Sequence, residues 1–526
     1  MESNLFLRAS SGLVKNATFL DVVIYNLGLI SIGIGIYFGQ RIIPEYYSSS
    51  NVYLSIMFSF ILMACVVIAF SAWARLIPRS GGIYIFLSRS GMPGLGFALS
   101  FMEVFSWIFY AALAAHMIYR YILLLLLQLS FPDADLAFLE SGISEFVVAA
   151  CLIWLAAASL IVGPRGFFTV QRIVFLVAVI GLVAMFAVLG GSSAAPAIGG
   201  FLPDLAADGG LDRATAAAAA LGWEQPDAGQ RIADSLRSSI WFLLPLVGSV
   251  FSIAIGGEIR GGGARQLPGM LISLVVAAAG FAAAFFFLDW AMPLSSQGAL
   301  LYLYDNGHGL HSYSGAQPEP NLVILLLAAG RNGWLAVLAT VGLMAWFWFW
   351  IPGVLSYAQR AFLAWSLDRI VPSRVGQLSA RFGTPSVSAV LAAGATTAAL
   401  IAIIWSPLVA TLVFFVSATI AWTVALAFGI VFPFVRRTVF DAALGHPSDS
   451  RGRIAFAMRC AIGATAMAII GVLLVTDPLA VGDLRSVLIA CGILFAVAVA
   501  IYVAATLIRR SEGLPLRATF DELPVE

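Results

Sequence analysis

Twelve stretches of this chain are apolar over about twenty residues each, and no other feature limits its fold as strongly. Sixty-one per cent of the residues are hydrophobic and 10% are charged. A helix needs roughly 20 apolar residues to cross a bilayer, where its backbone polar groups can only pair with one another. We therefore predict an all-α integral membrane protein with twelve transmembrane helices. The predicted spans lie at about 18–38, 52–77, 96–129, 145–163, 167–190, 238–257, 269–293, 334–365, 386–405, 408–435, 454–475 and 486–508.

The first and sixth spans carry helix breakers near their centres. Gly33 and Gly35 lie in the first span, and Pro245 and Gly248 lie about 215 residues further on, in the sixth. A broken helix leaves N–H and C=O groups unpaired, so it is tolerated at membrane depth only where it lines a cavity inside the protein. Breaks at matching positions of two halves are typical of the substrate site of a secondary transporter. We expect non-helical backbone at both places, facing one shared cavity.

The order of the spans predicts a 5+5 inverted repeat. Spans 1–5 and 6–10 each open with a broken helix, and an odd number of spans per repeat forces opposite orientations in the membrane. The predicted organisation is a cytoplasmic segment at 1–17, a transporter core at 18–437, helices 11 and 12 at 438–510, and a cytoplasmic tail at 511–526. Within the core, the repeats cover about 18–190 and 238–435, with the outer loop 191–236 between them.

Basic residues predict the orientation of the chain. Twenty-one of the 28 Lys and Arg residues fall on the side that holds both termini. The positive-inside rule therefore places both termini in the cytoplasm of a multi-pass protein of the cell membrane. The net charge of +1 and the lack of a basic cluster interleaved with aromatic residues give no sign of nucleic-acid binding. The apolar segment 321–329 is too short to cross, so we expect a helix in or near the membrane interface.

Four stretches, which span roughly residues 18–437, carry a resemblance to a known family. They are Gly33-Ile-Gly35-Ile-Tyr37, then Ile77-Pro-Arg-Ser-Gly81-Gly82-Ile-Tyr84, then Glu258-Ile-Arg260 with Arg265-Gln-Leu-Pro268, and finally Gln359-Arg360-Ala-Phe-Leu-Ala-Trp-Ser-Leu-Asp368 with Arg381-Phe-Gly383-Thr384-Pro385. Together they resemble the amino acid–polyamine–organocation permeases. The resemblance implies a leucine-transporter-like fold with broken helices 1 and 6, and transport of a small amphipathic solute.

Several positions depart from the family pattern. Ile34 stands where the family has a small hydroxyl residue, Ala72 stands where it has a glutamate, and Pro245 replaces a small or aromatic residue. Span 8 lacks the Ser/Thr pair with which sodium-coupled relatives bind their cation. Proton coupling or exchange is therefore favoured over sodium coupling.

The candidate substrate-binding residues gather at the two breaks and on span 8. At a break, half-helix N-termini offer N–H groups and a partial positive charge to a carboxylate, whereas close packing through small residues is the alternative explanation of the glycines. Aromatic residues of span 8 would wall the cavity. The candidates are Ser31, Gly33, Ile34, Gly35, Ile36, Trp241, Pro245, Gly248, Ser249, Trp346 and Trp348. We expect a bulky residue at Gly35 or Gly248 to abolish uptake and leave folding largely intact.

Four further residues are candidates for coupling or gating: Glu103, His116, Glu258 and Arg360. Ionisable groups inside the bilayer are costly and are functional candidates by default. Glu103 would carry a proton or pair with an inner-face arginine, and His116 would be a neutral core residue or a proton relay. Glu258 and Arg360, with Asp368, would form ion pairs of an inner gate or anchor helix ends at the headgroups.

These features predict a secondary active transporter of an amino acid or related amine that works by alternating access. The alternatives are a carrier of another small solute, such as a cation or nucleobase-like compound, and, with less support, a membrane enzyme or a transceptor. We predict no cofactor and no metal site, because Asp305, His308 and His311 lack a further ligand. The predicted partners are the small-molecule substrate, protons and the lipid bilayer, with a homodimer as one candidate assembly.

Overall fold

The computed structural model describes residues 12–131, 135–191, 210–224, 226–307, 319–330, 333–406, 415–513, 516 and 520. Within this part of the chain, twelve helical segments are long and apolar enough to cross a membrane, and no strand is formed. The predicted all-α architecture with twelve spans is therefore confirmed. His308 and His311, and the predicted start of the tenth span at 408, lie outside the described residues.

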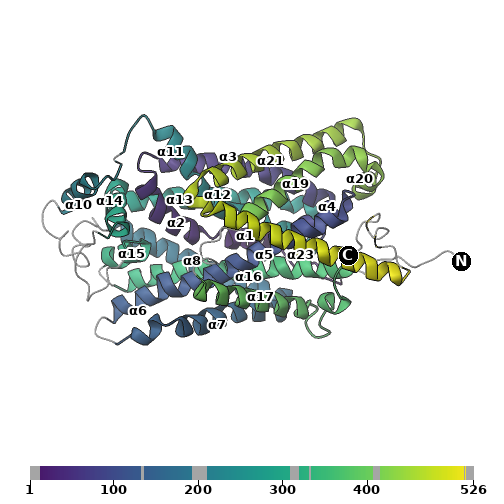
Figure 1. Cartoon of the computed structure of the whole chain (residues 1–526), viewed down its shortest axis with the longest axis horizontal. Coiled ribbons are helices and arrows are strands. Elements are labelled where there is room, and N and C mark those ends of the chain that lie inside the picture. The colour runs from purple at the N-terminus through teal and green to yellow at the C-terminus, as the bar shows by residue number, and fades with distance from the viewer. Residues whose placement is uncertain are drawn as a thin grey trace.

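The helices of the spans run side by side along the long axis of the molecule (Figure 1). The first span consists of α1 (Phe19–Ile30) and α2 (Ile32–Tyr46). The other spans contain α3 (Val52–Leu76), α5 (Pro93–Met117) with a π-helical turn (Ile118–Leu123) and α6 (Leu124–Ser130), α7 (Gly142–Ile161), α8 (Pro164–Gly190), α11 (Arg231–Ser238) with α12 (Ile240–Leu246) and the 3₁₀ helix η4 (Val247–Ala254), α13 (Gln266–Ala291), α16 (Trp334–Leu367), α17 (Ser386–Trp405), α19 (Phe415–Val435), α21 (Ser450–Thr476), and α22 (Pro478–Val481) with α23 (Leu484–Ser511).

Short helices cover the two ends of the bundle (Figure 1). α4 (Ile83–Arg89) and α20 (Arg437–Leu444) lie at one end, and α10 (Gly210–Ala220), α14 (Leu294–Asp305) and α15 (Leu322–Ala329) lie at the other. Asn321 caps α15 by accepting the N–H groups of Val323 and Ile324. Every residue of α15 is buried, against α16, α8 and α2, so the helix is covered by protein, and its expected position in or near the membrane interface stays a prediction.

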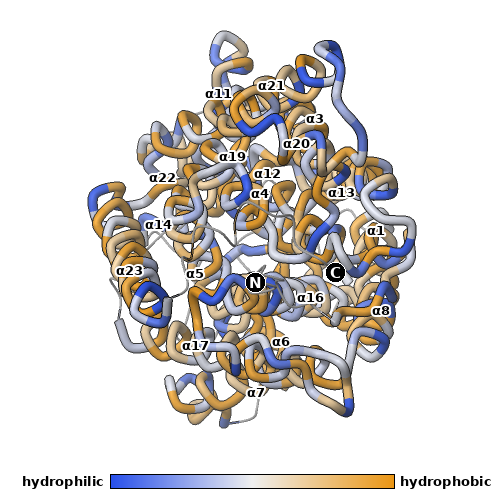
Figure 2. The backbone as a smooth tube through the Cα atoms, turned by 90° about the vertical axis from the view of Figure 1, so that its right-hand side faces the viewer, coloured by the Kyte–Doolittle hydropathy of each residue, from blue (hydrophilic) through white to orange (hydrophobic). Residues whose placement is uncertain are grey.

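Burial separates central spans from peripheral ones. In the apolar windows of the first and third spans 83% of the residues are buried, compared with 17% in the last span. Hydrophobic residues dominate the helices in Figure 2, and hydrophilic residues gather at loops and helix ends. On α8, α21 and α23 many large hydrophobic side chains stay exposed on the protein, for example Ile173, Val472 and Ile493. Such faces are those expected of helices that contact lipid.

The first span is interrupted at a single residue. Ser31 has φ of 47° and ψ of 79°, a left-handed conformation that costs a non-glycine residue roughly 1–2 kcal/mol. Its hydroxyl donates to the carbonyl of Trp346 at 2.8 Å, and its own carbonyl accepts the N–H groups of Ile34 and Gly35. Non-helical backbone was expected around Gly33–Gly35; the span is broken two residues earlier, at Ser31, and both glycines lie in the first turns of α2.

The sixth span changes its helix type and stays helical. α12 ends at Leu246, and the chain continues as the 3₁₀ helix η4, which contains Gly248. Pro245 lies near the end of α12 and has no N–H to donate to the preceding turn, which favours a change of geometry there. The expectation of non-helical backbone at Pro245–Gly248 is thus wrong, since the backbone tightens to i→i+3 bonding instead.

The two spans cross at very close range. A Cβ atom at Gly248 would lie 2.2 Å from the carbonyl carbon of Leu29 and from the nitrogen of Ile30. One turn earlier on α1, the side chain of Asn26 accepts the N–H of Ser252 at 3.0 Å and donates to the hydroxyl of Ser252 at 3.2 Å. Gly248 therefore lets η4 touch the backbone of α1 beside the break at Ser31.

This contact predicts the effect of Gly248→Ala. Because the added Cβ meets backbone that cannot rotate away, we expect a loss of about 1–3 kcal/mol of stability from overpacking. Thermal unfolding of the purified protein in detergent should show a lower Tm. The matched control is Gly492→Ala on α23, where no atom lies within 4 Å of the added Cβ. Equal Tm values for wild type and Gly248→Ala would show that the crossing is not this tight. The earlier expectation that folding tolerates a bulky residue here is corrected by the same geometry.

Candidate functional site

A cavity of about 280 Å³ lies beside the break at Ser31. Helices from six spans contribute to its wall, and they include both halves of the predicted core. The lining residues are Ile30, Ile34, Gly35, Phe38, Ile42, Trp107, Tyr110, Leu113, Ala114, Met117, Trp241, Leu244, Pro245, Trp350, Phe415, Leu479 and Ala480. The volume lies just below the usual range for drug-sized ligands, so the cavity fits a small molecule.

The wall of the cavity is apolar and aromatic, and none of its side chains is charged among the residues that the structure describes. Its polar side-chain groups are already engaged within the protein. Trp350 Nε1 donates to the carbonyl of Leu29 at 2.8 Å, and the hydroxyl of Tyr110 accepts the N–H of Phe415 at 3.1 Å. Charged groups of a ligand would therefore meet backbone groups and the Tyr110 hydroxyl, whose proton donates to no other described residue.

Four of the eleven candidate binding residues lie at the wall: Ile34, Gly35, Trp241 and Pro245. Gly35 also packs closely behind the wall, because a Cβ atom there would lie 2.5 Å from the ring of Phe281. Ile34 is half-buried and exposes its side chain to the cavity. Their part in binding stays a prediction.

The other seven candidates do not line this cavity. Ser31, Gly33 and Ile36 are buried where α2 begins, and a Cβ at Gly33 would meet the side chain of Trp346 at 2.6 Å. Gly248 packs on the backbone of α1, as the alternative of close helix packing required. The remaining three lie in η4 and α16: Ser249 is buried, Trp346 contacts Phe175, and Trp348 donates to the carbonyl of Leu152.

Sequence reasoning missed Trp350 and the contribution of span 3. Trp346 and Trp350 are four residues apart, so they lie on one face of α16, and both contact the break in the first span. This spacing could have singled out Trp350 over Trp348. Trp107 has the same spacing from the candidate Glu103, on one face of α5, and could have been found in that way. Tyr110 had no such signal, because its partner Phe415 is known only from the fold.

Glu103 lies directly behind the cavity wall. Its Oε1 accepts hydrogen bonds from Trp107 Nε1 at 3.2 Å, from the Tyr357 hydroxyl at 2.7 Å and from Trp422 Nε1 at 2.6 Å. The carboxyl group is fully buried, and its Oε2 has no hydrogen-bond partner among the described residues. No arginine contacts Glu103 in this part of the chain, so the alternative of an inner-face ion pair is wrong.

A glycine of the span 2 motif supports the same group. Gly82 has φ of +62°, and a Cβ atom there would lie 2.5 Å from the hydroxyl oxygen of Tyr357. A side chain at this position would displace the hydroxyl that donates to Glu103. The Gly81-Gly82 motif thus places the end of span 2 against span 8 and against the contacts of Glu103.

His116 pairs with a carboxylate from the next span. Its Nδ1 hydrogen-bonds to Oε1 of Glu145 on α7, and its ring packs edge-on against Tyr121. The pair is only partly buried. The structure therefore gives His116 a hydrogen-bonded partner, as the core alternative expected, while its role in coupling is left as a prediction.

Two buried ion pairs join the core at the end where α4 lies. Arg360 on α16 donates to both carboxylate oxygens of Glu258, at 2.8 and 2.9 Å. Arg89 on α4 donates to both oxygens of Asp368, at 2.8 and 3.0 Å. Glu258, Arg360 and Asp368 were expected to form ion pairs, and each does so, but Asp368, at the end of α16, takes Arg89 of α4 as its partner.

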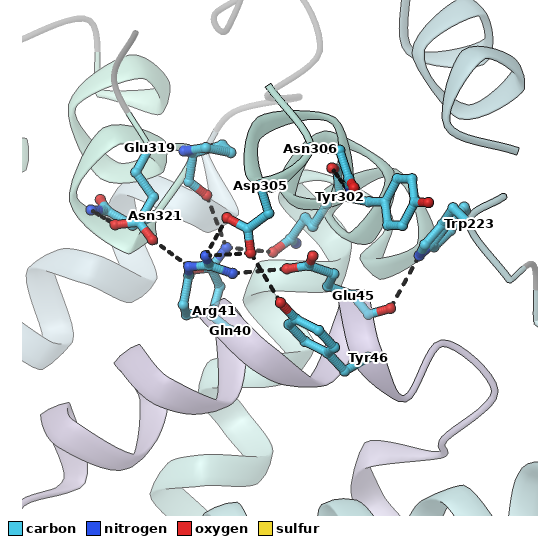
Figure 3. Close-up of polar contacts among 12 residues, drawn as sticks. Gln40, Arg41, Glu45, Tyr46, Trp223, Tyr302, Asp305, Asn306, Glu319 and Asn321 are labelled. Carbon is cyan, nitrogen blue, oxygen red and sulfur yellow. Dashed lines mark hydrogen bonds and ion pairs between the residues drawn. The ribbon is translucent and has the colours of Figure 1, made fainter. Parts of the chain in front are cut away.

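A polar cluster closes the opposite end of the first span (Figure 3). Arg41 on α2 contacts three carboxylates: Glu45 at 2.8 Å, Asp305 on α14 at 2.7 Å, and Glu319 before α15. The hydroxyl of Tyr46 also donates to Asp305 at 3.0 Å. Sequence reasoning missed this cluster, since its members are up to 278 residues apart.

Comparison with known families agrees with the motifs. Residues 21–221 match the family model described as amino acid permease. A search of curated proteins found no match. The family match covers the break at Ser31, the span 2 motif and Glu103, and it confirms the resemblance to the amino acid–polyamine–organocation permeases. With its twelve apolar helices, the chain is a multi-pass membrane transporter of amino acids or related solutes.

The buried ion pair between Glu258 and Arg360 predicts that substitutions at the two residues have strongly coupled effects on stability. Glu258→Gln or Arg360→Gln alone leaves a buried charge unpaired, which costs roughly 3–5 kcal/mol, whereas the double variant removes both charges and should recover part of that loss. Thermal unfolding in detergent measures the effect. The control pair is Arg437 with Asp441, whose exposed contact at 3.6 Å should give no measurable coupling. If the stability losses of the Glu258 and Arg360 variants simply add in the double variant, the two residues do not stabilise the protein as an ion pair.

Proposed function

We propose that this protein is a secondary active transporter that carries an amino acid or related amine across the cytoplasmic membrane by alternating access. The observation that carries the proposal is the cavity beside Ser31, which lies between two sets of ionic contacts. In the proposed cycle, a solute held there would leave toward one side when the contacts at that end open. Such a site, lined by discontinuous helices, is the arrangement typical of secondary transporters.

The substrate would be bound through the backbone at the break. The first turn of α2 begins at Ile32, so its positive dipole end would attract the substrate carboxylate. The N–H groups that remain for the carboxylate are those of Ile32 and Gly33, because Ile34 and Gly35 already donate to the carbonyl of Ser31. The carbonyl groups at the end of α1 would face an ammonium group. The apolar remainder of the wall, with Phe38, Trp107 and Trp350, would hold the substrate side chain by burial and by cation–π or stacking contact.

Helix packing supports two inverted repeats, at about 18–190 and 238–435. If spans 1–5 correspond to spans 6–10, each contact should have a counterpart. Span 3 (α5) packs on span 9 (α17), and the corresponding spans 8 (α16) and 4 (α7) also pack on each other. In the same way, span 5 (α8) packs on span 8 (α16), and the corresponding span 10 (α19) packs on span 3 (α5). In the proposed cycle, spans 1, 2, 6 and 7 rock against spans 3, 4, 8 and 9. Glu258–Arg360 would then act as an inner gate and the Arg41 cluster as an outer gate.

The orientation is supported by contacts at the end that holds the inner gate. Ala17, just before α1, pairs with Glu258 and Arg260 through its backbone, and Arg509 near the end of α23 donates to the carbonyl of Arg369. The first and last spans therefore begin and end on one side. The excess of basic residues on that side favours the cytoplasm for both termini.

Proton coupling would use Glu103. Its buried carboxyl faces no positive charge, has one free oxygen and contacts the cavity wall through Trp107. A proton on this group would remove an expensive charge from the membrane interior. The route to Glu103 would pass Trp107, so movement of that ring would link substrate binding to protonation.

Uptake into proteoliposomes tests the transport proposal. With a panel of labelled amino acids and amines, wild-type protein should accumulate at least one compound. Ile34→Trp should abolish this uptake, because the added ring fills the cavity. Ile61→Trp on α3 is the matched control, since Ile61 is 51% exposed on the outer surface. Equal uptake by Ile34→Trp and wild type would place the substrate elsewhere.

Glu103→Gln tests the coupling proposal. The change is nearly isosteric and removes the titrating group, so uptake driven by a pH gradient should disappear. Exchange across equilibrated membranes should persist, because counterflow needs the rocking step but no net proton movement. Glu140→Gln, at an exposed glutamate between α6 and α7, is the control. Normal pH-driven uptake by Glu103→Gln would return Glu103 to a structural role.

A further inference from the structure

The turn between spans 11 and 12 reaches the cavity, although these spans stand outside the proposed repeats. Leu479 and Ala480 of the short helix α22 belong to the cavity wall, as do Trp241 and Phe38. Ala480 is buried and Leu479 is 40% exposed, so the turn lies between the cavity and the outside of the protein. The rest of the twelfth span is largely peripheral.

Asp477 fixes this turn to the wall from two directions. One carboxylate oxygen accepts the N–H groups of Leu479 and Ala480, at 3.0 and 3.1 Å, so it positions the backbone of both lining residues. The other oxygen accepts the hydroxyl of Tyr47, which follows α2. Asp477 is 7% exposed and its contacts are therefore shielded from water.

Tyr47 extends the connection to the sixth span. Its hydroxyl accepts Trp241 Nε1 at 3.4 Å, and Trp241 stacks on Phe38 with ring centroids 6.3 Å apart. Burial, and the hydrogen bond to Asp477, raise the pKa of Tyr47, so the hydroxyl keeps the proton that it donates. The turn, the end of α2 and Trp241 are thus linked by one chain of hydrogen bonds.

We propose that α22 is a specificity-determining wall of the substrate cavity, and that Asp477 is the positioning residue that sets its distance from Trp241. The proposal rests on the transport function proposed above. Leu479 and Ala480 limit the length of substrate side chain that fits between α22 and the rings of Trp241 and Phe38. A small alanine at 480 leaves room for a bulky apolar group, and a larger residue there removes that room.

Ala480→Leu tests the wall. Competition against uptake of the labelled substrate, with unlabelled amino acids of increasing side-chain size, should show an apparent affinity for the bulkiest competitors that is about tenfold weaker. Small competitors should be affected much less. The control is Ala490→Leu, on the same span and outside the cavity lining. If the apparent affinities of the competitors in Ala480→Leu stand in the same ratios as in wild type, the proposal is overturned.

Asp477→Ala tests the positioning role. It removes the acceptors for Leu479, Ala480 and Tyr47. The ratio between the apparent affinities of small and large competitors should therefore fall severalfold. Asp477→Asn keeps one acceptor oxygen, for the N–H groups of Leu479 and Ala480, and loses the acceptor for the Tyr47 hydroxyl, so it should restore discrimination in part. Asp483→Ala is the matched control, because Asp483 caps the next helix through the N–H of Arg485 and has no contact with the cavity. A lower Tm with unchanged discrimination in Asp477→Ala would reduce Asp477 to a structural cap.

The two proposals fail in distinguishable ways. If wild-type protein neither takes up nor binds any amino acid or amine, the transport function is wrong. Binding can be followed without transport by fluorescence, because Trp107, Trp241 and Trp350 line the cavity. If wild-type protein transports and the variants at 477 and 480 keep its selectivity, only the role of α22 is wrong.

Discussion

The single left-handed residue at Ser31 is the constraint on which the central architecture depends. A helix cannot pass through this conformation, so α1 ends and α2 begins inside the protein, where the freed backbone groups need partners. Span 8 supplies one of them, because Trp350 Nε1 donates to the carbonyl of Leu29, and the carbonyl of Trp346 accepts the Ser31 hydroxyl. Gly248 brings η4 into backbone contact on the other side. The strained residue is thus held between two spans, and the cavity opens beside it.

The rest of the proposed machinery follows from that arrangement. A wall without charged side chains suits backbone recognition of a zwitterion, and it places the titratable group, Glu103, one aromatic ring further away. The ion pairs stand at the two ends of the same spans, where they join α2 and the end of the sixth span to their neighbours. The Glu258–Arg360 pair is buried and therefore costly to break singly, whereas the Arg41–Asp305 contact is partly exposed and is expected to contribute less.

Much of this was predictable from pattern alone. Twelve spans could be located to within several residues, because length and hydropathy decide whether a helix can cross lipid. Glu103, Glu258 and Arg360 stood out as charges in apolar surroundings. Ile34, Gly35, Trp241 and Pro245 were found at the wall because helix breakers mark the spans that line a cavity. Gly33 and Gly248 were noticed for the same reason, yet they serve close packing.

By itself, the sequence determined the membrane class, the number of spans, the two irregular helices and the family resemblance, since each depends on local composition or short motifs. Only the tertiary structure decided which residue breaks the first span, because a left-handed serine is stabilised by partners about 315 residues away. It also decided that Arg360 pairs with Glu258 while Asp368 pairs with Arg89. Finally, it brought α22 to the cavity. No local pattern in the sequence encodes this contact, because contacts between distant segments depend on how all the helices pack together.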